Sequence, residues 1–102
     1  GDVTYQTLAG AVSTSTHGTG LQRTGLAAQI DSFRLVTAVG ETMVCSTEQN
    51  QDFFHCGRVS LGALGVITEV TLRVVPAFNL RAVEQPMRID YVLDNFSRLI
   101  ET

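Results

Sequence analysis

A segment rich in glycine and hydroxyl residues, "GAVSTSTHGTGLQRTG" from Gly10 to Gly25, is the part of the sequence best suited to hold a ligand. Glycines let backbone N–H groups approach a ligand closely, and such amides can bind an anion without any lysine. Thr14, Thr16 and Thr19 add hydroxyl donors. A phosphate or diphosphate is therefore the natural ligand, although clusters of this composition more often mark plain surface loops.

The same segment matches neither of the common nucleotide motifs. It has no Gly-Lys-Ser/Thr ending, so it is not a P-loop, and Gly18-x-Gly20 follows no predicted strand and leads into no predicted helix. The residues alone leave two readings open, a ligand-binding loop and a mobile connection.

Cysteine and histidine are too sparse to form a metal site. Cys45 and Cys56 are too few for a disulfide framework, and their spacing fits no zinc pattern. His55 lies beside Cys56, but no third and fourth ligand accompany the pair. We predict no metal and two reduced, half-buried thiols.

The composition argues against several classes of partner. The chain has 102 residues and a net charge of −3, and its arginines are scattered along the sequence with no lysine among them. A nucleic-acid or anionic-membrane surface would need clustered positive charge. No apolar stretch is long enough to span a bilayer, and no signal sequence is apparent. These features favour a soluble, cytoplasmic polypeptide and leave the compartment of any parent protein open.

Alternating apolar residues predict a hairpin followed by a helix. The two strands are expected at 32–38 and 42–46, with Gly40 in the turn. The helix is expected at 51–59, where Gly57 favours an early end. The side chains expected on its buried side are Phe53, Phe54 and Cys56.

The second half of the chain predicts two more strands and a closing helix. The clearest strand runs from Val66 to Val75 and stops at Pro76, and it is followed by a second strand at 79–87 and a helix at 90–101. One face of the clearest strand is expected to carry Val66, Val70, Leu72 and Val74, and the helix stripe Val92, Leu93, Phe96, Leu99 and Ile100. This order of elements predicts an α+β fold, a mainly antiparallel sheet with flanking helices, in one domain at most.

Three motifs in order resemble one known family. "TLAGAVSTSTHGTG" (7–20), "LVTAVGE" (35–41) and "SLGALGVITEVTLRVVP" (60–76) look like the second half of the PCMH-type FAD-binding domain of the vanillyl-alcohol-oxidase superfamily. Within that superfamily they are most similar to the sugar-1,4-lactone oxidases and dehydrogenases and to the alditol oxidases. One such motif is weak, whereas three in order are a specific signal.

The resemblance implies FAD as cofactor and assigns its contacts. In the family, the segment matching 10–20 crosses the FAD diphosphate and the flavin edge, and the "GVIT" segment lies toward the adenosine end. His17 receives a positioning role, because the family's covalent flavin link usually comes from a histidine in an upstream loop. The candidate cofactor-binding residues are Gly10, Ala11, Thr14, His17, Gly18, Thr19, Gly65, Val66 and Ile67.

The resemblance also implies a larger parent enzyme. Residues 1–102 would be an FAD-binding subdomain, with 88–102 starting the connection to the substrate domain. Its partners would be an N-terminal FAD subdomain and a substrate-binding cap of the same chain. The parent would oxidise a CH–OH group of a sugar lactone or alditol by hydride transfer to flavin N5. No catalytic residue is assigned. The piece alone is expected to be inactive, because it would carry only half of the FAD site.

A non-enzymatic alternative also fits the sequence. In this reading the chain is a stand-alone α+β binding or interaction module, and "STSTHGTG" is only a mobile loop. In either case, uncovered strand edges and the apolar helix stripe invite self-association.

Overall fold

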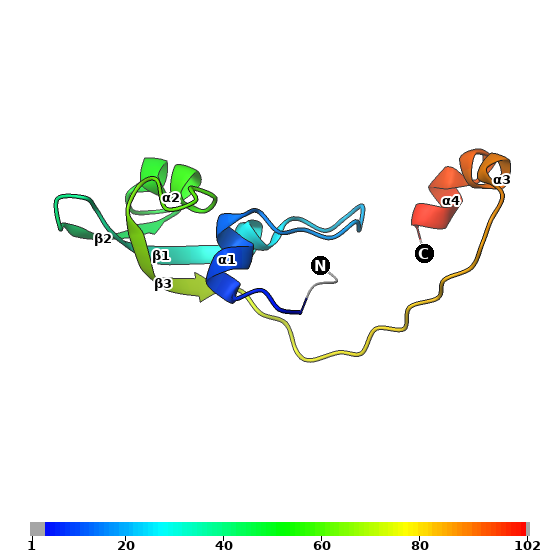
Figure 1. Cartoon of the computed structure of the whole chain (residues 1–102), viewed down its shortest axis with the longest axis horizontal. Helices are drawn as coiled ribbons and strands as arrows, with labels where there is room; N and C mark the ends of the chain where they lie inside the picture. The colour runs from blue at the N-terminus through cyan, green and yellow to red at the C-terminus, as the bar shows by residue number, and fades with distance from the viewer. Residues whose placement is uncertain (1–3, 102) are drawn as a thin grey trace.

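A computed structural model describes residues 4–101 of the chain (Figure 1). An antiparallel sheet and the helices that pack against it form the packed part of the chain, and the C-terminal residues extend away from it. The elements are α1 (Leu8–Ser13), the 3-10 helix η1 (Leu26–Gln29), β1 (Ile30–Val36), β2 (Thr42–Ser46), α2 (Gln51–Gly57), β3 (Val66–Leu72), α3 (Ile89–Asp94) and α4 (Phe96–Ile100). This arrangement confirms the predicted α+β class.

The sheet has the strand order β2-β1-β3, and both pairings are antiparallel. The predicted hairpin is confirmed, with Gly40 in the turn at φ 82° and its N–H bonded to the Thr37 carbonyl at 3.0 Å. β1 begins and ends two residues earlier than predicted, because that turn already starts at Thr37.

An irregularity in the β1–β3 pairing changes which side chains face the core. Arg34 pairs with Glu69 and the next residue, Leu35, pairs with Ile67, so Thr68 is the extra residue of a bulge. The bulge turns Val66 outward to 65% exposure and leaves Ile67 half-buried. The prediction that Val66 shares a face with Val70 is therefore wrong.

The core lies between the sheet and α2, and α1 adds Val12 to it. Phe33 and Phe54 stack with ring centroids 5.9 Å apart, and both are almost fully buried. Gly57 permits this contact, because a Cβ there would lie 2.4 Å from the Phe33 ring. α2 ends at Gly57, earlier than Val59, as the glycine indicated. The buried core cluster comprises Val12, Ile30, Phe33, Leu35, Cys45 and Phe54.

Several residues expected in the core are exposed. Phe53 lies partly in solvent beside buried Phe54, and Phe96 is largely exposed. The prediction of two half-buried thiols is wrong for both cysteines, since Cys45 is buried and Cys56 exposed. Burial raises the pKa of the Cys45 thiol above its ordinary value.

The first helix, α1, was not predicted, because its sequence was interpreted as a loop. Thr7 caps it by accepting the Gly10 N–H at 3.1 Å. The helix ends in a Schellman-type C-cap: Ser15 adopts φ 57°, and the Thr16 N–H bonds the Ala11 carbonyl at 2.9 Å. Both ends of this short helix are thus satisfied by its own flanking residues.

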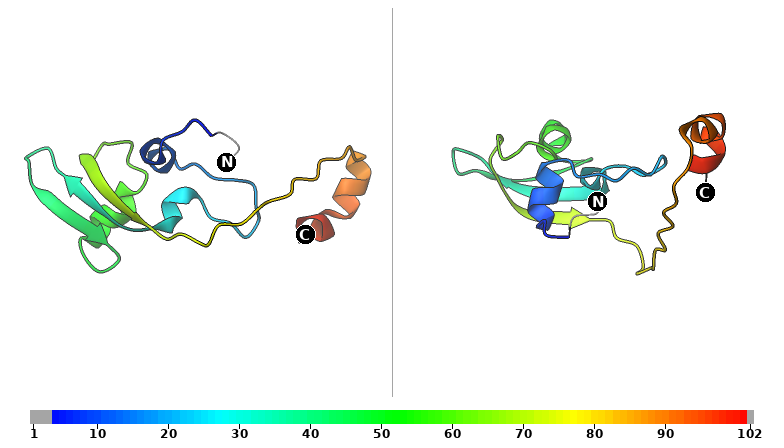
Figure 2. Two further views of the ribbon diagram at one scale, coloured as in Figure 1. Left: turned by 90° about the horizontal axis from the view of Figure 1, so that it is seen from below. Right: turned by 45° about the vertical axis from the view of Figure 1, so that its right-hand side comes forward.

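Residues 73–101, which we call the arm, leave the packed part of the molecule (Figure 2). Arg73 is its anchor: its N–H bonds the Gln29 carbonyl at 2.9 Å, and its guanidinium bonds the Ala28 carbonyl and pairs with Asp31. The radius of gyration is 18.0 Å, against about 13 Å for a compact domain of this length. The arm makes the molecule elongated.

Three predictions for residues 66–101 need correction, two of them only in their bounds or continuity. The strand at 66–75 ends at Leu72, and the strand at 79–87 is absent because no neighbouring strand lies beside it in the described chain. The helix at 90–101 is divided into α3 and α4 at Asn95, whose side chain bonds the Tyr91 carbonyl. Within residues 4–101, no helix has the length and apolar character needed to cross a membrane.

Candidate functional site

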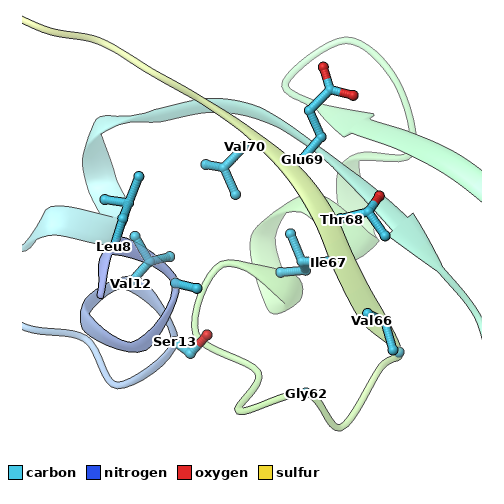
Figure 3. Close-up of a pocket in the computed structure, with 11 residues that line it drawn as sticks. Leu8, Val12, Ser13, Gly62, Val66, Ile67, Thr68, Glu69 and Val70 are labelled. Carbon is cyan, nitrogen blue, oxygen red and sulfur yellow. The ribbon is translucent and has the colours of Figure 1, made fainter. Parts of the chain in front are cut away.

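A groove of about 560 Å³ lies between α1 and β3 (Figure 3). One wall comes from the helix, the other from β3 and the turn that precedes it. The lining residues are Leu8, Ala9, Val12, Ser13, Gly62, Gly65, Val66, Ile67, Thr68, Glu69 and Val70. The groove thus joins two segments that are far apart in the sequence.

Apolar side chains dominate the groove. Leu8 and Val12 on α1 face Ile67 and Val70 on β3 (Figure 3). Glu69 is the one charged residue among the lining residues that the structure describes. Its carboxylate pairs with the Arg34 guanidinium at 3.0 Å and points away from α1. The groove therefore suits a neutral, flat or extended apolar group.

The predicted cofactor residues divide into three sets around this groove. Gly65, Val66 and Ile67 line it directly. Gly10 and Ala11 lie on α1 between lining residues but do not line it themselves. The remaining four, in the segment after α1, are exposed and outside the groove: Thr14, His17, Gly18 and Thr19.

The segment after α1 is closed at its base by backbone hydrogen bonds. The Leu26 N–H bonds the Thr16 carbonyl at 2.9 Å, and the Thr14 hydroxyl donates to the Gly10 carbonyl at 2.9 Å. His17 Nδ1 lies 2.9 Å from the Gly18 carbonyl. The base is therefore fixed, while Gly18, Thr19 and Gly20 are exposed.

The glycines of the site differ in what requires them. At Gly65, φ is 140° and a Cβ would lie 2.2 Å from the Val36 carbonyl oxygen, so the fold itself excludes a side chain. At Gly10, a Cβ would meet the capping hydroxyl of Thr7 at 3.2 Å. At Gly18, nothing lies within 4 Å. The chain's own packing therefore explains Gly65 and gives no reason for Gly18.

Sequence reasoning missed the helical wall of the groove and the turn at its end. Thr7 followed by Leu8 and Val12, four residues apart, is a capped helix with one apolar face, and this signal was available in the sequence. The turn before β3 has positive φ at Leu61 (53°) and Gly62 (81°), and only the glycine was detectable as a turn residue.

The described residues 4–101 contain no cluster of side chains that could hold a metal ion. No three side chains of His, Cys, Asp or Glu there gather closely enough to hold an ion. The chemistry available to the groove is thus apolar contact, supplemented by exposed backbone groups of the neighbouring loop.

The chain is similar to enzymes that act on sugar lactones. No protein-family model matches it. It is 45% identical over 101 residues to the L-gulono-1,4-lactone dehydrogenase of Mycobacterium tuberculosis. This alignment covers 99% of the present chain and 23% of the dehydrogenase.

Two further relatives extend the similarity to animals and fungi. Identity is 41% over 95 residues to the L-gulonolactone oxidase of Bos taurus, covering 93% of this chain and 22% of the relative. It is 31% over 96 residues to the D-arabinono-1,4-lactone oxidase of Debaryomyces hansenii, covering 94% and 17%. The chain thus spans about a fifth of the length of these curated relatives, and nearly all of it aligns with sugar-lactone oxidases and dehydrogenases.

Proposed function

We propose that this chain is the second FAD-binding subdomain of a larger oxidoreductase, of the PCMH type, that oxidises a CH–OH group of a sugar lactone or polyol. The observation that carries the proposal is the groove, since it joins α1 of the glycine-rich segment to Gly65, Val66 and Ile67. The similarity to lactone oxidases and dehydrogenases supports the same reading.

The described residues fit a dinucleotide with flat rings. The groove falls within the roughly 300–1,000 Å³ that is typical of ligand pockets, and its apolar walls suit a flat ring system. The exposed backbone at Gly18 and Thr19 suits the diphosphate, which amides can bind without lysine. Bound FAD would supply the redox chemistry by accepting a hydride at N5.

Each part of the chain then has a separate task. Gly10 and Ala11 belong to α1, whose other residues form one wall of the groove, and Gly65 keeps the start of β3 close to Val36. His17 is held by its contact with the Gly18 carbonyl, and it positions the loop that carries the diphosphate. Residues that bind the lactone or polyol belong to other parts of the parent protein.

The arm belongs to the connection between subdomains in this proposal. The ion pair between Arg88 and Asp90 and the hydrogen bond between Asn95 and Tyr91 lie within residues 88–101, which suits a segment that joins the substrate domain of the same polypeptide. An N-terminal FAD subdomain would complete the cofactor site. The 102-residue chain alone is therefore expected to purify without flavin and to show no turnover.

The test compares two substitutions in the complete parent protein. Gly18→Val fills open space in the loop, and Ala38→Val makes a similar change in the exposed hairpin turn. We expect Gly18→Val to lose bound flavin, measured as visible absorbance per protein, and its Kd for FAD to rise at least about tenfold, or 1.4 kcal/mol. Ala38→Val should retain flavin. A parent protein that binds no FAD, or a Gly18→Val variant with unchanged affinity, would contradict the proposal.

A further inference from the structure

Most arginine side chains of this chain have a partner within residues 4–101. Three form ion pairs with carboxylates and two lie over aromatic rings: Arg34, Arg73 and Arg88 with carboxylates, Arg58 and Arg98 over rings. The guanidinium groups of Arg23 and Arg81 have no ion pair, ring contact or hydrogen bond to these described residues. Because a guanidinium carries five N–H donors and is always charged, both arginines retain their full capacity to bind an anion.

The sequence around Arg23 contains no negative charge. Arg23 is the one residue among Asp, Glu, Lys and Arg between positions 3 and 30, in a chain whose net charge is −3. The next acidic residue, Asp31, already pairs with Arg73 at 3.0 Å. Arg23 therefore presents a positive charge that no carboxylate of its own segment neutralises, and such a charge favours an anionic ligand.

A tight turn holds the base of the Arg23 side chain against the loop after α1. The Arg23 N–H donates to the Gly20 carbonyl at 3.0 Å, which closes the four-residue turn 20–23. A Cβ at Gly20 would lie 2.9 Å from Cγ of Arg23 and 3.4 Å from its Cβ, so the stem of the arginine lies over this glycine. The side chain thus starts beside Gly18 and Thr19, which are exposed.

The same loop follows the helical wall of the groove. α1 ends at Ser13, which lines the groove, and the loop leads away from that end of the helix (Figure 1). Among the described lining residues of the groove, the one charge is Glu69, and it is already paired with Arg34. The groove therefore offers apolar contact and no positive charge of its own, whereas the neighbouring loop offers an unpaired arginine.

We propose that Arg23 binds the diphosphate of the cofactor and so makes this site selective for an anionic flavin nucleotide. The inference rests on the proposed FAD site and adds one side-chain donor to the backbone amides of the loop. The planar guanidinium can donate two parallel hydrogen bonds to phosphate oxygens, and such charge-assisted bonds are stronger than those between neutral groups. Because Arg23 is exposed, dissolved salt screens this attraction.

The experiment measures the Kd for FAD of the complete parent protein, by quenching of flavin fluorescence, at low and at high salt. Arg23→Gln should raise the Kd about tenfold at low salt. The difference should nearly vanish in about 1 M salt, where the Debye length is only about 3 Å. Arg81→Gln is the matched control, because it removes the other arginine without a partner in residues 4–101 from a position on the arm. It should leave the Kd unchanged.

Phosphorus NMR spectroscopy of bound FAD shows where Arg23 acts. We expect the diphosphate signals to shift in Arg23→Gln and to stay in place in Arg81→Gln, while the visible absorbance spectrum of the flavin is the same in both. A parent protein that binds no FAD would contradict the proposed function itself. Normal FAD binding by Arg23→Gln, or a weakening that persists at high salt, would overturn the role of Arg23 alone.

Discussion

The sheet and the arm have similar sequence patterns, but the apolar side chains are buried in the sheet and exposed in the arm. β1 alternates apolar and polar residues and buries Phe33, whereas residues 77–83 alternate in the same way and leave Phe78 exposed. The difference lies in their neighbours, because β1 has a strand on each side and α2 across its face, while the arm has none. Alternation therefore specifies a strand-forming face, and burial depends on a partner that the local sequence does not encode.

The largest expected effect comes from truncating one phenylalanine in each region. Phe54→Ala should lower the free energy of unfolding by about 3–5 kcal/mol, because it empties a site in the core, where Phe54 is 1% exposed. Phe96→Ala, at 56% exposure, should change it by less than about 0.5 kcal/mol. Urea unfolding followed by circular dichroism measures both. Equal losses would mean that the arm is packed like the core.

Glycines give the next contrast, between the fold and the site. Gly65→Ala should cost roughly 3 kcal/mol, since the Cβ would strain a positive-φ backbone and collide with the Val36 carbonyl. Gly18→Ala should cost less than about 0.5 kcal/mol, because it enters open space. Thermal unfolding of the two variants tests this difference. A severe loss at Gly18 would show that the loop is part of the packed structure.

A smaller, stabilising effect is expected at the end of α1. Ser15 occupies the left-handed position of the C-cap at φ 57°, a conformation that glycine adopts without strain. Ser15→Gly should therefore raise the free energy of unfolding by about 0.5–1 kcal/mol. The melting temperature is the measurement. A decrease would indicate that the serine side chain contributes more than its backbone strain costs.

The smallest effect concerns charge at the end of the arm. The Arg88 guanidinium, at 2.7 Å, holds the pKa of the Asp90 carboxyl below its ordinary value. Because the carboxylate form is favoured in the folded arm, this support for α3 is present above the ordinary Asp pKa and is lost as pH falls through the lowered value. In Arg88→Ala, nuclear magnetic resonance titration should return the Asp90 pKa toward its ordinary value. No change would mean that the pair does not persist in solution.

Elements could be predicted from the sequence where an alternating or helical pattern of apolar residues coincides with packing against another strand or helix. The hairpin, α2 and the start of β3 occur where alternation and turn residues placed them, because Gly40 and the buried phenylalanines leave few other solutions. The bulge at Thr68 was not predictable, since it reflects how β3 fits against β1. Gly57 was interpreted only as a weak helix residue, although its role depends on the distant ring of Phe33.

The groove brings together only some of the residues singled out in the sequence. Gly65, Val66 and Ile67 line it, and their contact with a cofactor stays a prediction. The helical wall was overlooked because Gly10 and the hydroxyl residues suggest a loop, while the cap at Thr7 stabilises a helix. Whether Thr14, His17, Gly18 and Thr19 contact a cofactor stays a prediction, since the hydrogen bonds of Thr14 and His17 are local and assign no such role.

The anchor at Arg73 has a consequence for limited proteolysis. Arg81 and Arg88 stand in extended backbone, as a protease that cleaves after arginine requires, whereas Arg73 is held by Gln29, Ala28 and Asp31. Cleavage within the arm is therefore expected after Arg81 and Arg88 and resisted after Arg73. The resulting shorter polypeptide would keep every buried residue of the sheet and α2. Trimming by a protease thus separates the folded unit from the segment that extends beyond it.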